Sequence, residues 1–214
     1  RGWTGLHDMS VSTQEVAIQQ ALAAQGELPI RIDNYMSQAD SGPVLAQGPS
    51  QDPTGLVRVR GVKLFMDGAL GSRGAALLAP YSDAEGTGLI VTPRETVDAI
   101  LAKARKSGAQ MAVHAIGDRG NRVILDAYQQ AFADDPAALK AARWRVEHAQ
   151  IVAPEDLPRF AQMGVVASMQ PSHAIGDLYF APARLGPERL KGAYAWESLL
   201  KSGAVVAGGS DAPV

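Results

Sequence analysis

Short apolar runs alternate with helical segments along the C-terminal half of this 214-residue sequence. The runs are about five residues long, which is the usual length of a buried strand. Strands separated by helices are typical of βαβ units, which build a parallel sheet. The alternation predicts strands at 110–114, 143–148, 165–169 and 204–208, and helices at 118–132, 154–163 and about 190–201.

The N-terminal half follows the same plan with longer connections. One helix is expected after Ser12, a capping residue, and another over 93–108, where a proline begins the helix and a glycine ends it. Segment 39–54 is rich in Gly, Pro, Ser, Gln and Asp and is predicted to be a loop. The glycine-rich segment that ends at Thr92 is long enough to be a functional loop. Strands are predicted at 2–8, 28–36 and 57–66.

Polar residues at the ends of these strands distinguish two possible folds. A (βα)8 barrel takes its catalytic residues from the C-terminal ends of several strands. A doubly wound sheet instead concentrates its site at one switch point, usually behind a glycine-rich first turn, and no such turn is present. We therefore predict an α/β fold that is most of a (βα)8 TIM barrel, as one catalytic domain over residues 1–214. The strand-end residues are His7, Lys63, His114, His148, Asp211 and the group 170–173.

Charge and composition exclude several kinds of partner. With 20 Lys+Arg, 22 Asp+Glu and a net charge of -2, the chain lacks the basic surface that binds nucleic acid or anionic membranes. The absence of cysteine excludes disulfides and thiolate metal sites. No stretch reaches the roughly 18 apolar residues of a membrane helix, and the first residues do not resemble a signal peptide. We expect a soluble protein, in the cytoplasm by preference, with the periplasm as the alternative.

Lys63 is a lysine inside an otherwise apolar strand. Burying an ammonium group without a partner costs several kcal/mol, so a buried lysine should be paired, neutralised or chemically modified. The alternative is a lysine at a strand edge whose stem extends to water. Its neutral amine could also take up CO2 and become a carbamate, an anionic group able to bridge two metal ions.

His114 and His148 are the residues that a metal would use. A lone histidine is more often structural, but two at equivalent strand ends can each present one ring nitrogen inward. Asp211 follows two glycines that allow close approach, and its carboxylate can both ligate a metal and move a proton. Together these residues predict a metal site with Asp211 as the catalytic acid–base.

Five segments resemble the amidohydrolase superfamily, specifically the YtcJ-like group (amidohydrolase family 3) that includes N-substituted formamide deformylases. They are GVKLFMDGALGSRGAAL, MAVHAIGDRGN, RWRVEHAQ, MQPSHA and GGSDAPV. The resemblance implies a distorted TIM barrel of the metal-dependent hydrolase type. It also implies that Lys63 is carboxylated and bridges metals, that His114 and His148 are ligands from the fifth and sixth strands, and that Asp211 comes from the eighth.

One departure from the family pattern concerns the first barrel strand. Family members carry a His-x-His pair there, and this sequence contains none. We expect an incomplete barrel without the first strand, the last helix and the terminal β-sandwich, and hence an internal portion of a roughly twofold longer enzyme. We also expect a metal to be absent or weakly held here, with Lys63 unmodified. The unpaired edge could associate with another copy, giving a homo-oligomer.

The segment after the lysine strand supplies two candidate substrate contacts, Asp67 and Arg73, in a loop that would line the barrel mouth. Its glycines lack the spacing of a phosphate-binding P-loop. His173 follows Pro171 at the end of the seventh strand, where it could contact substrate, support a ligand or lie at the surface.

Three functions remain open on these residues. The first is hydrolysis of a C–N bond in a small amide- or formamide-type substrate, with one or two divalent ions, zinc by preference, activating a water molecule. The second is a Schiff-base aldolase that uses Lys63. The third is a non-catalytic barrel with a role in binding or assembly.

Overall fold

The computed structural model describes residues 2–212, which divide into two compact units. The N-terminal unit comprises Arg1–Leu64 and Asp98–Ala112. The C-terminal unit comprises Phe65–Val97 and Val113–Val214. Three elements contribute residues to both units: β4 (Val57–Phe65), α3 (Arg94–Ser107) and β5 (Gln110–Ala115).

The strands form one sheet in which neighbours follow chain order. The remaining strands are β1 (Gly5–Val11), β2 (Arg31–Met36), β3 (Ser50–Gln51), β6 (Arg145–His148), β7 (Val166–Met169) and β8 (Val206–Gly208). The order is β1-β2-β4-β5-β6-β7-β8, with β3 paired to β4 at the side. The pairs β1/β2, β2/β4, β6/β7 and β7/β8 are parallel, whereas β3/β4 is antiparallel. A doubly wound sheet would reverse its strand order, so the predicted incomplete (βα)8 barrel is confirmed.

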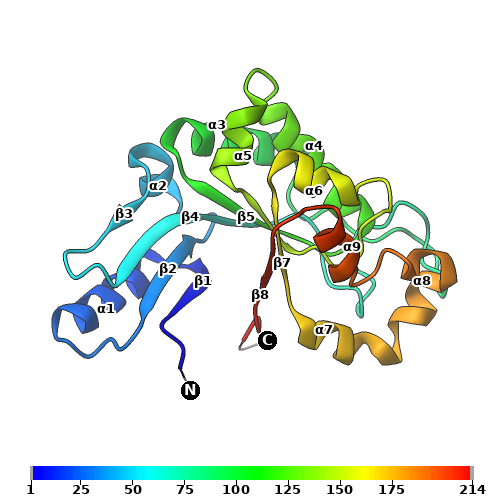
Figure 1. Cartoon of the computed structure of the whole chain (residues 1–214), viewed down its shortest axis with the longest axis horizontal. Helices are drawn as coiled ribbons and strands as arrows, with labels where there is room; N and C mark the ends of the chain where they lie inside the picture. The colour runs from blue at the N-terminus through cyan, green and yellow to red at the C-terminus, as the bar shows by residue number, and fades with distance from the viewer. Residues whose placement is uncertain (1, 213–214) are drawn as a thin grey trace. The chain divides into compact units, whose positions relative to one another are not determined.

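The N-terminal unit contains α1 (Thr13–Ala24) between β1 and β2 (Figure 1). Ser12 caps this helix as predicted. Its hydroxyl accepts a hydrogen bond from the Glu15 backbone N–H at 3.2 Å, and the Glu15 carboxylate accepts one from the Ser12 N–H at 2.8 Å. This reciprocal pair satisfies two amide groups that a helix start would otherwise leave unpaired.

The prediction of a loop over 39–54 is wrong in part. The segment holds α2 (Gly42–Gln47), which has a proline in its first turn, and the short strand β3. Proline is tolerated at a helix start because its missing N–H would have no partner there. Pairing with β4 then orders Ser50 and Gln51, which no local pattern indicates.

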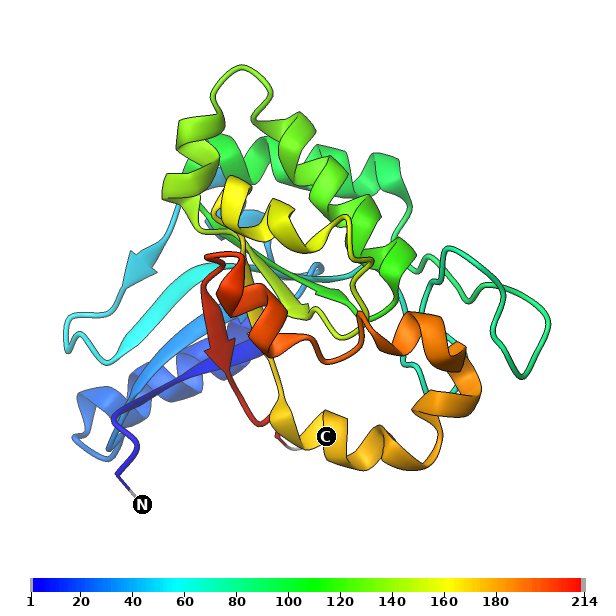
Figure 2. The ribbon, with the colours of Figure 1, turned by 45° about the vertical axis from the view of Figure 1, so that its right-hand side comes forward.

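Helices connect the strands of the C-terminal unit. They are α4 (Asp118–Ala131), α5 (Pro136–Ala142), α6 (Leu157–Met163), α7 (Pro171–Gly176), the 3-10 helix η1 (Asp177–Tyr179), α8 (Ala181–Leu190) and α9 (Trp196–Lys201). Figure 2 shows α4, α5 and α6 lying together, and residues of each contact the other two. Within residues 2–212 no helix combines the length and the apolar character needed to cross a membrane.

The helix predicted at about 190–201 is shorter in the structure, where α9 covers only Trp196–Lys201. α8 ends at Leu190, and α9 begins only at Trp196. Tyr194, between them, has a φ of 51°, a left-handed backbone conformation that a continuous helix cannot contain. α5 and α7 are absent from the sequence prediction; each is short and has a proline in its first turn.

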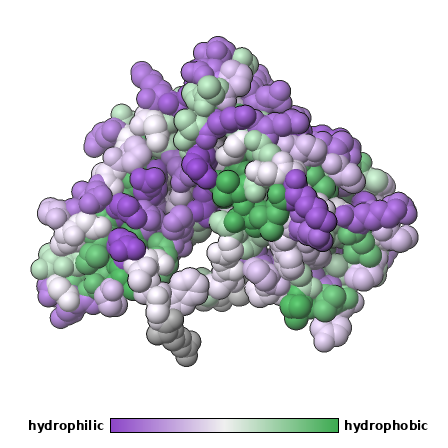
Figure 3. All heavy atoms as spheres, viewed as in Figure 1, coloured by the Kyte–Doolittle hydropathy of each residue, from purple (hydrophilic) through white to green (hydrophobic). Residues whose placement is uncertain are grey.

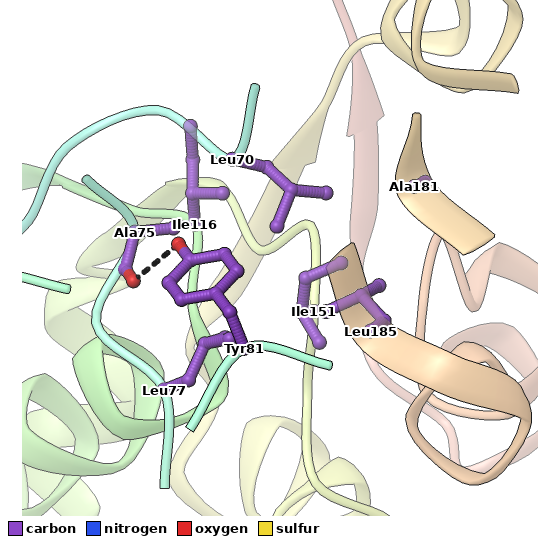
Figure 4. Packing of buried hydrophobic residues seen from close by; sticks show 8 residues of the cluster. All are labelled: Leu70, Ala75, Leu77, Tyr81, Ile116, Ile151, Ala181 and Leu185. Atoms are coloured by element: carbon purple, nitrogen blue, oxygen red, sulfur yellow. Dashed lines mark hydrogen bonds between the residues drawn. The ribbon is translucent and has the colours of Figure 1, made fainter. Parts of the chain in front are cut away.

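The long segment after β4 has its own core. Its residues Leu70, Ala75, Leu77 and Tyr81 pack with four residues from later in the unit: Ile116, Ile151, Ala181 and Leu185 (Figure 4). The Tyr81 hydroxyl donates a hydrogen bond to the Ala75 carbonyl at 2.7 Å. Leu70 and Leu77 are 1% and 0% exposed, so this predicted loop is a packed part of the fold.

Candidate metal centre

His114 lies near the C-terminal end of β5, and its side chain is 12% exposed. Its ring centroid is 4.5 Å from that of His148 and 5.5 Å from that of Phe65. Its Nε2 lies 3.4 Å from Asp67 Oδ1. Since Nε2 faces the carboxylate, Nδ1 is the nitrogen left to interact elsewhere.

Asp67 joins the start of the long segment to the end of β5. Its side chain is 0% exposed, and its oxygens accept hydrogen bonds from the backbone N–H groups of Ala76, Ile116 and Gly117 at 2.9, 2.9 and 2.8 Å. Burial raises the pKa of Asp67 to about 6, although these amide donors lower it. Asp67 is therefore buried against the residues that follow β5, and its contact with a substrate stays a prediction.

His148 is the last residue of β6 and adopts a φ of 75°. Its Nδ1 lies 2.8 Å from Gln170 Oε1. The other end of the Gln170 amide donates from Nε2 to the Ser168 carbonyl at 3.3 Å, which fixes the orientation of the amide. With the amide in this orientation Nδ1 of His148 is the donor, and in the neutral ring Nε2 then bears the lone pair that a metal requires.

His173, on α7, and Asp211, after β8, lie beside His148. The ring of His173 stacks on that of His148 with centroids 5.5 Å apart, and its Nε2 is 3.7 Å from Asp211 Oδ2. One donor atom from each of the three residues lies within 4.8 Å of the other two. Two imidazole nitrogens and one carboxylate oxygen are a common donor set for catalytic zinc, which leaves a fourth position for water or substrate.

The predicted site residues differ in how the structure places them. His114, His148 and Asp211, predicted as ligands, lie in the same unit as His173, which was predicted as a substrate or supporting contact and is one of the three clustered donors. Its signal in the sequence was its place just after the seventh strand. A catalytic role of Asp211 remains a prediction.

Arg73 and Lys63 lie outside this cluster. Arg73 has a φ of 59°, its side chain is 40% exposed, and its Nη2 lies 3.1 Å from Asp83 Oδ2. Contact of Arg73 with a substrate is a prediction. Lys63 belongs to the N-terminal unit, where it is 5% exposed and its Nζ donates to the Leu64 carbonyl at 3.3 Å. Its burial confirms that the stem does not extend to water.

Comparison with known proteins relates the whole chain to one family. The profile of the amidohydrolase family matches residues 1–214. "Protein LONG AFTER FAR-RED 3" of Arabidopsis thaliana is 43% identical over 156 residues, and "Putative amidohydrolase YtcJ" of Bacillus subtilis (strain 168) is 38% identical over 154 residues. Each comparison covers 72% of this chain but only 26% and 28% of the two relatives. The chain thus spans about a quarter of their length.

A solved structure gives the same relationship. The crystal structure of an uncharacterized metal-dependent hydrolase from Pyrococcus horikoshii OT3 is 32% identical, with a TM-score of 0.86. The similarity covers 98% of this chain and 41% of that protein. These matches confirm the resemblance seen in the five sequence segments. The chain belongs to the amidohydrolase family.

Proposed function

We propose that this chain provides metal ligands and the acid–base residue of a hydrolase that cleaves a C–N bond in an amide- or formamide-type substrate. The observation that carries the proposal is the cluster of His148, His173 and Asp211, whose donor atoms lie within 4.8 Å of one another. Membership of the amidohydrolase family and similarity to a metal-dependent hydrolase support it.

The three clustered residues would hold one divalent ion, with zinc as the first choice, and His114 is the nearest further imidazole to His148. When bound, such an ion supplies an activated water and polarises the carbonyl group that the water attacks. His148 would bind through Nε2, because Gln170 accepts the proton of its Nδ1. The ring orientation is then set before any metal binds.

Asp211 would move the proton. Its side chain is 30% exposed, so water can reach a carboxylate oxygen that also faces His173 at 3.7 Å. The carboxylate would accept a proton from the attacking water and return it to the amine nitrogen as the C–N bond breaks. One residue would thus act first as base and then as acid.

Metal content tests this proposal directly. We expect the full-length protein, expressed with zinc and dialysed, to retain stoichiometric zinc by elemental analysis and to hydrolyse members of a panel of N-substituted formamides. His148→Ala and Asp211→Ala should lose zinc, whereas the control His7→Ala, a 47% exposed histidine of the other unit, should retain it. Zinc-free protein, or hydrolysis that survives chelation, would refute the proposal.

Lys63 is a further part of the same proposal, because the family resemblance implies that its amine is carboxylated. A carbamate would explain a lysine that is 5% exposed, since bound metals would balance its charge. Lys63→Ala should lower zinc content and activity together, with partial rescue by a small carboxylic acid. Lys63→Arg should restore neither zinc content nor activity, because a guanidinium cannot take up CO2 and stays positive. Full zinc content and activity in the arginine variant would contradict this role.

A further inference from the structure

The helix that carries His173 is not held in place by burial. α7 has six residues, all described by the structure, and none is buried. Ile175 in α7 and Leu178 in the following η1 are 67% and 64% exposed, and Figure 3 shows apolar surface in this part of the C-terminal unit. So short a helix has little stability of its own. Something other than hydrophobic packing must therefore fix the position of His173.

Glutamine side chains tie both ends of α7 to the end of β6 and the residues just after it. At its first end, Gln170 bonds to His148 Nδ1 at 2.8 Å. At its last end, Asp177 accepts a hydrogen bond from Gln150 Nε2 at 2.5 Å. His173 lies between these two attachments, and His148 and Gln150 are separated by only one residue. Both ends of the helix are thus attached to the same short segment, from His148 to Gln150.

The attachment at Asp177 has two donors. Besides Gln150, the Tyr194 hydroxyl donates to Asp177 Oδ2 at 2.5 Å, and Gln150 Nε2 lies 3.2 Å from the same hydroxyl. Burial, followed by the hydrogen bond to Asp177, raises the pKa of Tyr194. The hydroxyl therefore keeps its proton and acts as the donor to the carboxylate.

The two donors are themselves held rigidly. The Tyr194 N–H donates to the Gln150 carbonyl at 2.7 Å, and the Val152 N–H donates to the Gly192 carbonyl at 2.9 Å. A Cβ atom on Gly192 would lie 2.0 Å from the Val152 carbonyl oxygen, so only glycine permits this approach. Gln150 is 4% exposed, which further restricts its side chain. Asp177 thus meets a preformed pair of donors.

We propose that Asp177 is a positioning residue that holds α7 so that His173 reaches the site shared with His148 and Asp211. The proposal rests on the proposed metal-binding function. Asp177 would not touch the metal or the substrate; its effect on the site would pass through His173 alone. Loss of a residue that orients a metal ligand typically lowers metal affinity about 10- to 100-fold.

A double-mutant cycle on zinc affinity tests this role. Affinity would be measured by competition with a chromophoric chelator for the parent protein, Asp177→Ala, His173→Ala and the double variant. We expect Asp177→Ala to weaken zinc binding about tenfold and to have no further effect when His173 is already alanine. Asp177→Asn keeps one acceptor oxygen and should recover part of the loss. An equal effect of Asp177→Ala in both backgrounds, or none in either, would overturn the proposal.

Two further measurements keep the outcome interpretable. Glu188→Ala is the matched control, because Glu188 is an exposed acid whose partner is the exposed Lys191, and it should leave zinc affinity unchanged. Hydrogen exchange should show faster amide exchange in α7 of Asp177→Ala and unchanged exchange in β6. If the parent protein bound no zinc, the proposed function would be wrong and this exchange result alone would decide the inference. Unchanged exchange in α7 would then refute it.

Discussion

His148 and His173 lie at the same candidate site, but the elements that carry them are held in place in different ways. His148 ends a strand whose four residues are all buried, whereas His173 is on a helix without a buried residue. The strand is fixed by packing and by its ladder of hydrogen bonds, while the helix is attached by a few polar side chains. In such a site the core of the fold fixes the position of His148. Polar substitutions can free His173 from its position without unfolding the protein.

The largest effect should come from Asp67→Asn, on the rigid side of this comparison. The amide nitrogen would replace one carboxylate oxygen and face at least one of three backbone N–H donors. Leaving a buried amide unpaired costs about 1–3 kcal/mol, and we expect about 3 kcal/mol less free energy of unfolding in urea titrations. Asp83→Asn, at a carboxylate in an exposed ion pair, is the control. Equal midpoints for the two variants would show that Asp67 does not secure the strand ends.

Val146→Ala should have the next largest effect. Val146 lies two residues before His148 on β6 and is 0% exposed. Removing two buried methyl groups and leaving a cavity should lower the free energy of unfolding by about 2 kcal/mol. The same titrations measure it. A loss below about 0.5 kcal/mol would mean that β6 is not the rigid support inferred above.

Gln170→Leu should separate stability from metal binding. The leucine has a similar volume but cannot accept the proton of His148 Nδ1. We expect the free energy of unfolding to fall by only about 1 kcal/mol, while zinc affinity falls about tenfold because the ring loses its fixed orientation. Chelator competition and urea titration on the same preparation would measure both. Unchanged zinc affinity would indicate that packing alone orients His148.

Leu178→Ser should have the smallest effect on stability. At 64% exposure the leucine buries little, so the free energy of unfolding should change by less than about 0.5 kcal/mol. Thermal melts of this variant beside Val146→Ala provide the contrast between the two supports. A loss comparable with that of Val146→Ala would show that the η1 surface is covered in the folded protein.

Much of the candidate site could be predicted from the polar residues at the C-terminal ends of the predicted strands. Alternating strands and helices predicted the barrel topology, and the positions at or shortly after the C-terminal ends of the strands contained His114, His148 and Asp211. The topology prediction is confirmed, and His148 and Asp211 lie together because parallel strands bring their C-terminal ends to the same edge of the sheet.

Other features depend on contacts between distant residues and leave no local pattern. The burial of Asp67 depends on amide groups some 50 positions later, at Ile116 and Gly117. The left-handed backbone of His148, with a φ of 75°, could not be predicted, because no glycine stands at this position. α7 lacks an apolar stripe, because polar attachments rather than packing hold it, so hydrophobic periodicity could not reveal it.

The core shared by the long segment after β4 and α8 has a consequence for how the protein folds. The guanidinium of Arg184 in α8 bonds to the Gly71 carbonyl across 113 positions of sequence, and Leu70 and Leu77 are buried in the core to which α8 contributes. Contacts between such distant residues carry a large loop-closure entropy and form slowly. During synthesis, these leucines would emerge long before α8 does. The segment therefore stays exposed to aggregation until α8 has been made.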